Sequence, residues 1–113
     1  MKRLFIAATL ASFALATQAA DVQKGQELVT KGNCAACHGE GLNKPIAPEY
    51  PRLAGQHADY LFYALKAYKT TNNPNVGRGN AIMAGQVAAF SNNDLKDIAA
   101  YISSLPGTLV LKK

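Results

Sequence analysis

Apolar residues recur at helical spacing in three parts of the chain, and they predict helices over residues 21–31, 57–70 and 91–105. The third pattern is the clearest, because Ser91 can cap its first turn and Pro106 ends it. Its expected buried face comprises Leu95, Ile98, Ala99, Ile102 and Leu105. The expected buried faces of the other two helices comprise Val22, Leu28 and Val29, and Leu61, Ala64, Leu65 and Tyr68.

The N-terminus follows a different pattern, in which Lys2 and Arg3 precede an apolar run over residues 4–16. Small residues follow this run, and the layout predicts a secretory signal peptide over residues 1–20, cleaved after Ala19 or Ala20. The run is too short to cross a bilayer comfortably as a permanent helix, so no stable membrane insertion is expected. We expect the remaining residues, 21–113, to form a single domain in the bacterial periplasm.

The chain is moderately basic, with a formal net charge of +5 at pH 7. Its lysines are spread out and form no block of five like charges. A nucleic-acid-binding domain normally has a concentrated basic face, so nucleic acid is not an expected partner. A dispersed positive charge instead suits brief encounters with an acidic protein.

Residues 34–38 read Cys-Ala-Ala-Cys-His and carry the clearest chemical motif of the chain. Two thiols three positions apart lie about one helical turn from each other, so each can add to one vinyl group of the same porphyrin. His38 follows directly, and its imidazole can reach the iron as the proximal ligand. The motif uses both cysteines, Cys34 and Cys37, and predicts one covalent c-type haem.

Three other interpretations of these cysteines stay open on this pattern alone. A thioredoxin-like dithiol also has a C-x-x-C motif, but in a βαβ context that the surrounding sequence does not indicate. A zinc site would draw on both cysteines, His38 and His57, although His38 is poorly placed for a closed tetrahedral site. A plain disulfide between Cys34 and Cys37 is sterically possible.

Two long segments, residues 39–56 and 71–90, have no regular pattern, and the first contains three prolines. Irregular stretches of this length are uncommon in a small compact domain. They are expected if they wrap around a large apolar cofactor that supplies part of the core. The segments therefore favour the haem interpretation independently of the cysteines.

A haem that carries electrons needs a second axial ligand, and the candidates are Met83 and His57. Met83 is the only methionine outside the expected signal peptide, and a loop within residues 71–90 can bring its sulfur to the opposite haem face. The alternative role for Met83 is to fill a gap in the core. His57 lies beside the expected start of a helix and is expected at the surface. Ligation by the Met83 thioether would raise the reduction potential relative to ligation by two histidines.

Four sequence blocks in this order give the chain a family resemblance. They are Cys34-Ala-Ala-Cys-His38, Pro51-Arg-Leu-Ala-Gly-Gln56, Met83-Ala-Gly-Gln-Val87 and Asp97-Ile-Ala-Ala-Tyr-Ile102. With these blocks the chain resembles class I c-type cytochromes, especially the small bacterial cytochrome c553/c5 group and single domains of cytochrome c4. The resemblance implies an all-α cytochrome c fold, with three main helices and long loops wrapped around one covalently bound haem. It also implies one-electron transfer between redox proteins, and no enzymatic reaction.

The resemblance assigns the two motif cysteines to thioether bonds, and His38 and Met83 to the iron. The carbonyl of Pro51 would accept a hydrogen bond from His38 Nδ1, which orients the ring and tunes its basicity. Leu53 would pack on the proximal side of the haem.

Other positions of the family pattern imply a helix crossing and a polar rim. Gly25 on the first helix would meet Ile98 and Tyr101 on the last, because a missing side chain lets two backbones approach. Candidates for hydrogen bonds to the haem propionates or to Met83 are Arg78, Asn80 and Gln56, which fit equally well as ordinary exposed polar residues. The tail, residues 107–113, departs from the family pattern.

Some functional alternatives stay open. If Met83 does not bind the iron, the open site would suit a haem enzyme or a gas-binding sensor. The chain would also suit the role of cytochrome subunit in a larger dehydrogenase. As a free carrier it is expected to be a monomer or a weak dimer that meets a membrane oxidase, a reductase or a dehydrogenase.

Overall fold

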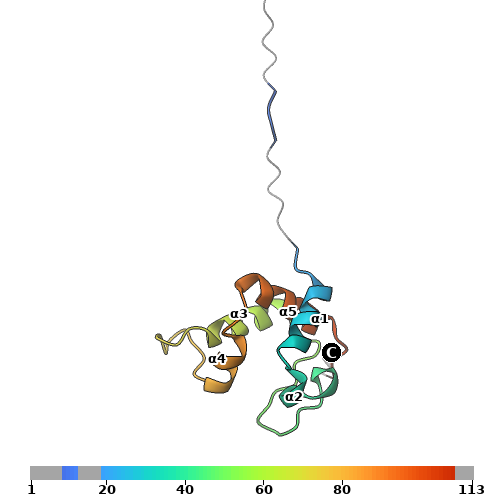
Figure 1. Cartoon of the computed structure of the whole chain (residues 1–113), viewed down its shortest axis with the longest axis vertical. Helices are drawn as coiled ribbons and strands as arrows, with labels where there is room; N and C mark the ends of the chain where they lie inside the picture. The colour runs from blue at the N-terminus through green and yellow to red at the C-terminus, as the bar shows by residue number, and fades with distance from the viewer. Residues whose placement is uncertain (1–8, 13–18, 109–113) are drawn as a thin grey trace, which may run out of the picture.

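The computed structural model describes residues 9–12 and 19–108 (Figure 1). Its elements, in chain order, are α1 (Val22–Lys31), α2 (Ala35–His38), the 3-10 turn η1 (Glu40–Leu42), α3 (Ala58–Tyr68), α4 (Ala81–Val87) and α5 (Asn92–Ser104). No strand occurs in these described ranges, which confirms the predicted all-α class. Most of the expected signal peptide and residues 109–113 of the tail lie outside the described residues.

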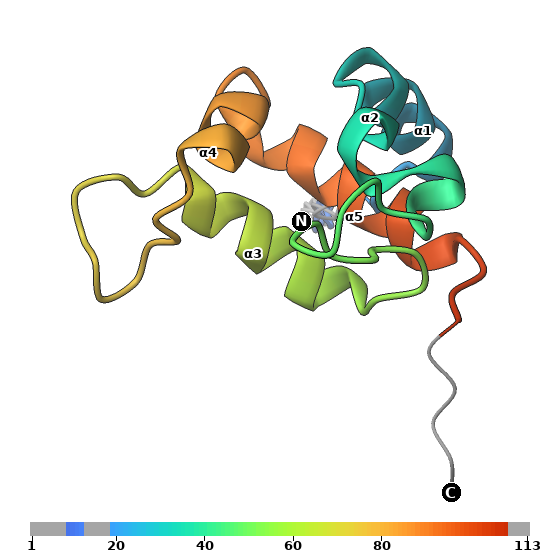
Figure 2. The same cartoon turned by 90° about the horizontal axis from the view of Figure 1, so that it is seen from below.

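The helices form two sides joined by α5. Figure 2 shows α1 and α2 on one side and α3 and α4 on the other, while α5 passes behind both. The contacts agree with this view, because α5 packs against both α1 and α3, and α3 packs against α4. None of the helices in the described part of the chain is long and apolar enough to cross a membrane.

The crossing of α1 and α5 is the most extensive contact between helices. At Gly25 a Cβ atom would lie 2.6 Å from the carbonyl carbon of Asp97 and 2.8 Å from the Cβ of Tyr101. Glycine is therefore the residue that lets the two backbones approach this closely. The expected contact with Tyr101 is confirmed, and the backbone of Asp97, beside Ile98 in the chain, lies closest to Gly25.

Polar contacts fix the ends of the same two helices. The Asp21 side chain caps α1, and the Asp21 N–H donates a 2.8 Å hydrogen bond to Asp97 Oδ1 on α5. The Lys24 ammonium lies 3.4 Å from a carboxylate oxygen of Asp94 and 3.7 Å from one of Asp97. Ser91 and Asp94 form the predicted cap of α5, in which each side chain accepts the other residue's backbone N–H.

A buried apolar cluster joins the helices. It comprises Val29, Leu42, Leu61, Val87, Leu95, Ile98, Ala99 and Ile102. The predicted face of α5 is confirmed, with Leu105 half-buried against the cluster. The prediction for α1 is wrong at Val22, which is the first residue of the helix and is 45% exposed.

The two segments expected to be irregular contain short helices. Residues 71–90 include α4, so Met83 lies on a helix rather than in a loop. The sequence pattern missed α4 because the helix is only seven residues long and buries only Val87. Residues 39–56 likewise contain η1.

Candidate functional site

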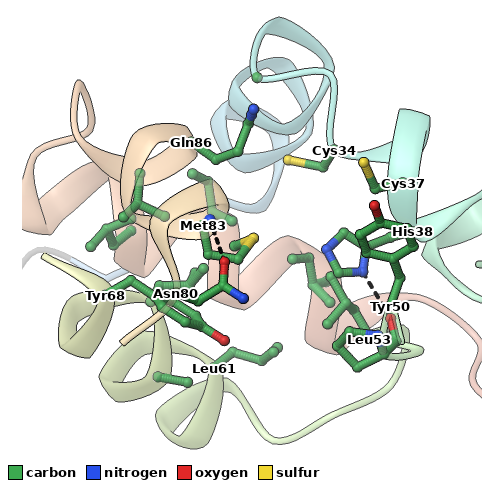
Figure 3. Close-up of a pocket in the computed structure, with 18 of the residues that line it drawn as sticks. Cys34, Cys37, His38, Tyr50, Leu53, Leu61, Tyr68, Asn80, Met83 and Gln86 are labelled. Atoms are coloured by element: carbon green, nitrogen blue, oxygen red, sulfur yellow. Dashed lines mark hydrogen bonds between the residues drawn. The ribbon is translucent and has the colours of Figure 1, made fainter. Parts of the chain in front are cut away.

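A cavity of about 350 Å³ lies between the two sides of the molecule (Figure 3). Its lining comes from α2, α3, α4, α5 and the segment before α3. Several lining side chains also pack on the core and are only half-buried, namely Leu53, Leu65, Tyr68, Met83 and Phe90. The face of α3 predicted to be buried lines the cavity as a whole, and of its side chains only Leu61 is fully buried.

The C-x-x-C-H motif lies in α2 along one wall of the cavity. Cys34 and Cys37 both line it, and neither forms a disulfide. The His38 ring is 7% exposed, and its Nδ1 lies 2.8 Å from the carbonyl oxygen of Pro51. Because a carbonyl only accepts, Nδ1 carries the proton and donates, which leaves the lone pair on Nε2. Figure 3 shows that Nε2 points into the cavity, toward Met83.

The alternatives for the two cysteines find no support in this arrangement. Burial raises the pKa of the Cys34 thiol, whereas a reactive dithiol needs a lowered pKa. Residues 9–12 and 19–108 contain no cluster of three or more His, Cys, Asp or Glu side chains suited to a metal. His57 is exposed at the start of α3, as expected, and does not line the cavity.

Met83 lies across the cavity from His38. It sits in the first turn of α4, half-buried, and Figure 3 shows its sulfur directed toward the His38 side. Asn80 caps α4, because its Oδ1 accepts the Met83 N–H at 3.0 Å. Asn80 thus contacts the backbone of Met83 rather than its sulfur.

Further residues complete the walls. Leu53 lines the cavity, and its N–H donates a 2.9 Å hydrogen bond to the Leu42 carbonyl. The Tyr50 ring stands edge-on to the imidazole, with ring centroids 6.4 Å apart. Sequence reasoning missed Tyr50, although its position beside Pro51 was a clue. Gln56 lines the cavity, and its Oε1 accepts the His57 N–H rather than projecting a free amide oxygen into the cavity.

The residues present fit a covalent haem. Two thiols lie side by side on one wall, and an imidazole nitrogen and a thioether sulfur face each other across a mainly apolar cavity. A family model for cytochrome c matches residues 22–106. The chain belongs to the cytochrome c family. Its cofactor is haem c, and Cys34 and Cys37 fit the motif for covalent attachment.

Known proteins similar to the chain include a small cytochrome and a cytochrome about twice as long as the matched region. Cytochrome c4 from Stutzerimonas stutzeri is 41% identical over 105 residues, which cover 89% of this chain and 49% of the relative. Cytochrome c-554(548) from Halomonas halodenitrificans is 40% identical over 86 residues, which cover 76% of this chain and 98% of the relative.

A solved structure extends the comparison to three dimensions. The crystal structure of reduced recombinant cytochrome c4 from Pseudomonas stutzeri matches with a TM-score of 0.69 and 39% identity, over 80% of this chain and 48% of that chain. The expected cytochrome c fold is thereby confirmed. The chain spans about half the length of the cytochrome c4 relatives it matches.

Proposed function

We propose that the chain is a periplasmic one-electron carrier whose haem iron is held between His38 and Met83. The observation that carries this proposal is the placement of His38 Nε2 and the Met83 sulfur on opposite walls of one cavity, beside the two cysteines. When bound, the haem supplies an iron that gains and loses one electron. The side chains described above bind it and set its surroundings.

Each side chain has a defined task in this proposal. The Pro51 carbonyl holds the Nδ1 proton of His38, which fixes the ring orientation and keeps Nε2 available. Leu53 and the apolar side chains of α3 exclude water from the cavity. Asn80 fixes the first turn of α4, which carries Met83. If His38 and Met83 both hold the iron, it would have no free position for a substrate, and this favours electron transfer over an enzymatic reaction.

The partners are redox proteins that meet the chain at the cavity edge next to the cysteines. Ala36 is exposed and Ile82 is 60% exposed, and both lie at this edge. A small apolar rim of this kind suits the weak, short-lived encounters of electron-transfer proteins. We expect a membrane oxidase, a reductase or a dehydrogenase as the partner, and a monomer or weak dimer as the working state.

Export precedes this function. Residues 1–20 would act as the signal peptide, and residues 21–113 would form the mature domain. Ala19 and Ala20 are exposed and precede α1, so cleavage after either residue leaves the helix intact. N-terminal mass analysis of the secreted protein tests this step, and an uncut N-terminus would contradict it.

Absorption spectra of the haem-loaded protein in both oxidation states test the proposed function. The full chain is expressed in a host that matures c-type cytochromes, with a known cytochrome as the maturation control. We expect a low-spin spectrum with the weak far-red sulfur–iron band in the ferric form. A high-spin spectrum would indicate an open iron site and favour a haem enzyme or sensor. A colourless product beside a matured control would overturn the haem assignment, and co-purification with a flavin or quinone enzyme would indicate a dehydrogenase subunit.

A further inference from the structure

Arg78 connects the segment that leads into α4 to two tyrosines of α3. One guanidinium nitrogen, Nη2, donates a 3.0 Å hydrogen bond to the Tyr60 hydroxyl, and Nη1 donates a longer one of 3.4 Å to the Tyr68 hydroxyl. The guanidinium carbon also lies 5.6 Å from the centre of the Tyr60 ring and 5.5 Å from that of Tyr68. A single side chain thus makes a hydrogen bond and a cation–π contact with each ring.

The spacing of the tyrosines makes this contact a bridge along α3. Tyr60 and Tyr68 are eight residues apart, and hence about 12 Å apart along the helix axis. The backbone takes part as well, because the Arg78 N–H donates a 3.1 Å hydrogen bond to the Ala67 carbonyl. Arg78 is therefore attached to α3 at three places over more than two helical turns.

The segment around Arg78 has few other attachments. Residues 71–76 are exposed, and α4 buries only Val87, near its far end. Asn80 caps α4 and holds the Met83 N–H, but the Asn80 side chain is itself part of this segment. The position of the first turn of α4 relative to α3 therefore depends strongly on Arg78.

The side-chain partners of Arg78 within the protein are aromatic rather than acidic. Within the described residues, no carboxylate lies within 4.0 Å of its guanidinium, and the ion pairs involve only Lys24 and Lys44. Arg78, Tyr60 and Tyr68 all line the cavity that Met83 faces. An arginine can bridge two hydroxyls with its planar fork, whereas a lysine in its place has one compact charged group.

We propose that Arg78 is a positioning residue that clamps the start of α4 to α3 and thereby keeps the Met83 sulfur at the iron. This inference rests on the proposed ligation by His38 and Met83. Arg78 acts through the backbone of residues 78–83 and touches neither the sulfur nor the iron. Without the clamp, the first turn of α4 moves away from the cavity more often, and the sixth coordination position opens more often.

Imidazole binding to the ferric, haem-loaded protein measures this opening. An external ligand must wait for the sulfur to leave, so its apparent affinity follows the population of the open form. In Arg78→Lys the two tyrosine bridges are lost, and we expect the apparent imidazole affinity to rise about tenfold. The matched control is Lys66→Arg, because Lys66 is also a cation over an aromatic ring of α3, that of Phe62, but does not line the cavity. Its imidazole affinity should stay at the wild-type value.

A second variant tests whether the hydrogen bonds from Arg78 to the two tyrosine hydroxyls hold the start of α4 in place. The double change Tyr60→Phe and Tyr68→Phe removes both hydroxyls and keeps both rings, so the affinity should rise in the same direction by a smaller factor. An unchanged imidazole affinity in Arg78→Lys, or an equal rise in Lys66→Arg, would overturn the clamp. The clamp would also be overturned if the rise in imidazole affinity in Arg78→Lys, expressed as a free energy, equals the loss in the free energy of global unfolding. If the wild-type ferric protein lacks the sulfur–iron band, the proposed ligation fails instead.

Discussion

The crossing of α1 and α5 makes Gly25→Ala an informative change. The added Cβ would lie 2.6 Å from the carbonyl carbon of Asp97, whereas ordinary contact begins at 3.4 Å. The obstructing atoms belong to the backbone of α5 and to the Cβ of Tyr101, so no flexible side chain can turn aside. The two helices must separate by close to 1 Å, or tilt, along their whole contact.

The size of the effect follows from two opposing contributions. Overpacking a well-packed contact costs about 1–3 kcal/mol, and the upper end applies here because a backbone must move. A gap of this width also removes a quarter to a half of the dispersion attraction between the atoms that it separates. Alanine offsets about 1 kcal/mol, because it favours a helix interior over glycine. We therefore expect a net loss of about 2 kcal/mol, which lowers the melting temperature by about 10 °C in a domain of this size.

Denaturant unfolding of the haem-loaded protein, followed by circular dichroism, measures this loss. The control is Gly85→Ala on α4, where an added Cβ meets no atom within 4 Å. That variant should be as stable as the wild type or more stable by up to about 1 kcal/mol. A Gly25→Ala protein that is stabilised as much as Gly85→Ala would refute the proposed role of this glycine, because only the gain in helix propensity would then remain.

Three further changes test the site and the core. Met83→Ala should abolish the far-red ferric band, admit imidazole directly and lower the reduction potential, and an unchanged spectrum and potential would rule Met83 out as the ligand. Leu95→Ala should cost about 2–5 kcal/mol of unfolding free energy in denaturant titrations, because Leu95 is fully buried; a loss below 1 kcal/mol would contradict its place in the core. The hydrogen bond from the Ser91 N–H holds the pKa of Asp94 below its ordinary value of 3.8. The ionised Asp94 side chain therefore stabilises the fold above that pH, and this effect is lost as the pH falls through the lower pKa of the folded state. The free energy of unfolding, measured from pH 6 to pH 2.5, should therefore fall more steeply in the wild type than in Asp94→Asn. Parallel curves would exclude a stabilising contribution from the ionised Asp94 side chain.

The sequence predicted the long helices well, because their buried faces have a regular period. Leu95, Ile98 and Ile102 repeat at helical spacing between a good cap and a proline, and these residues are buried in α5. The short helices could not be predicted from the spacing of apolar residues. The α4 helix has seven residues and one buried side chain, so its pattern is too brief to distinguish from a loop.

The site was predictable in its chemistry but not in its geometry. The C-x-x-C-H motif identified the cofactor because two thiols and an imidazole are adjacent in sequence. The bridge from Arg78 to Tyr60 and Tyr68 had no such pattern, because it joins residues 10 and 18 positions apart through a loop. Likewise, the close approach of Gly25 to the backbone of Asp97 depends on the angle between two helices, which no local pattern specifies.

The contact between α1 and α5 also imposes an order of events in time. The Asp21 N–H and the Asp97 carboxylate that it meets are 76 positions apart, so α1 lacks its main helix partner until nearly the whole chain has emerged. Cys34 and Cys37 appear early in this interval. A porphyrin can thus reach them before α5 packs against α1.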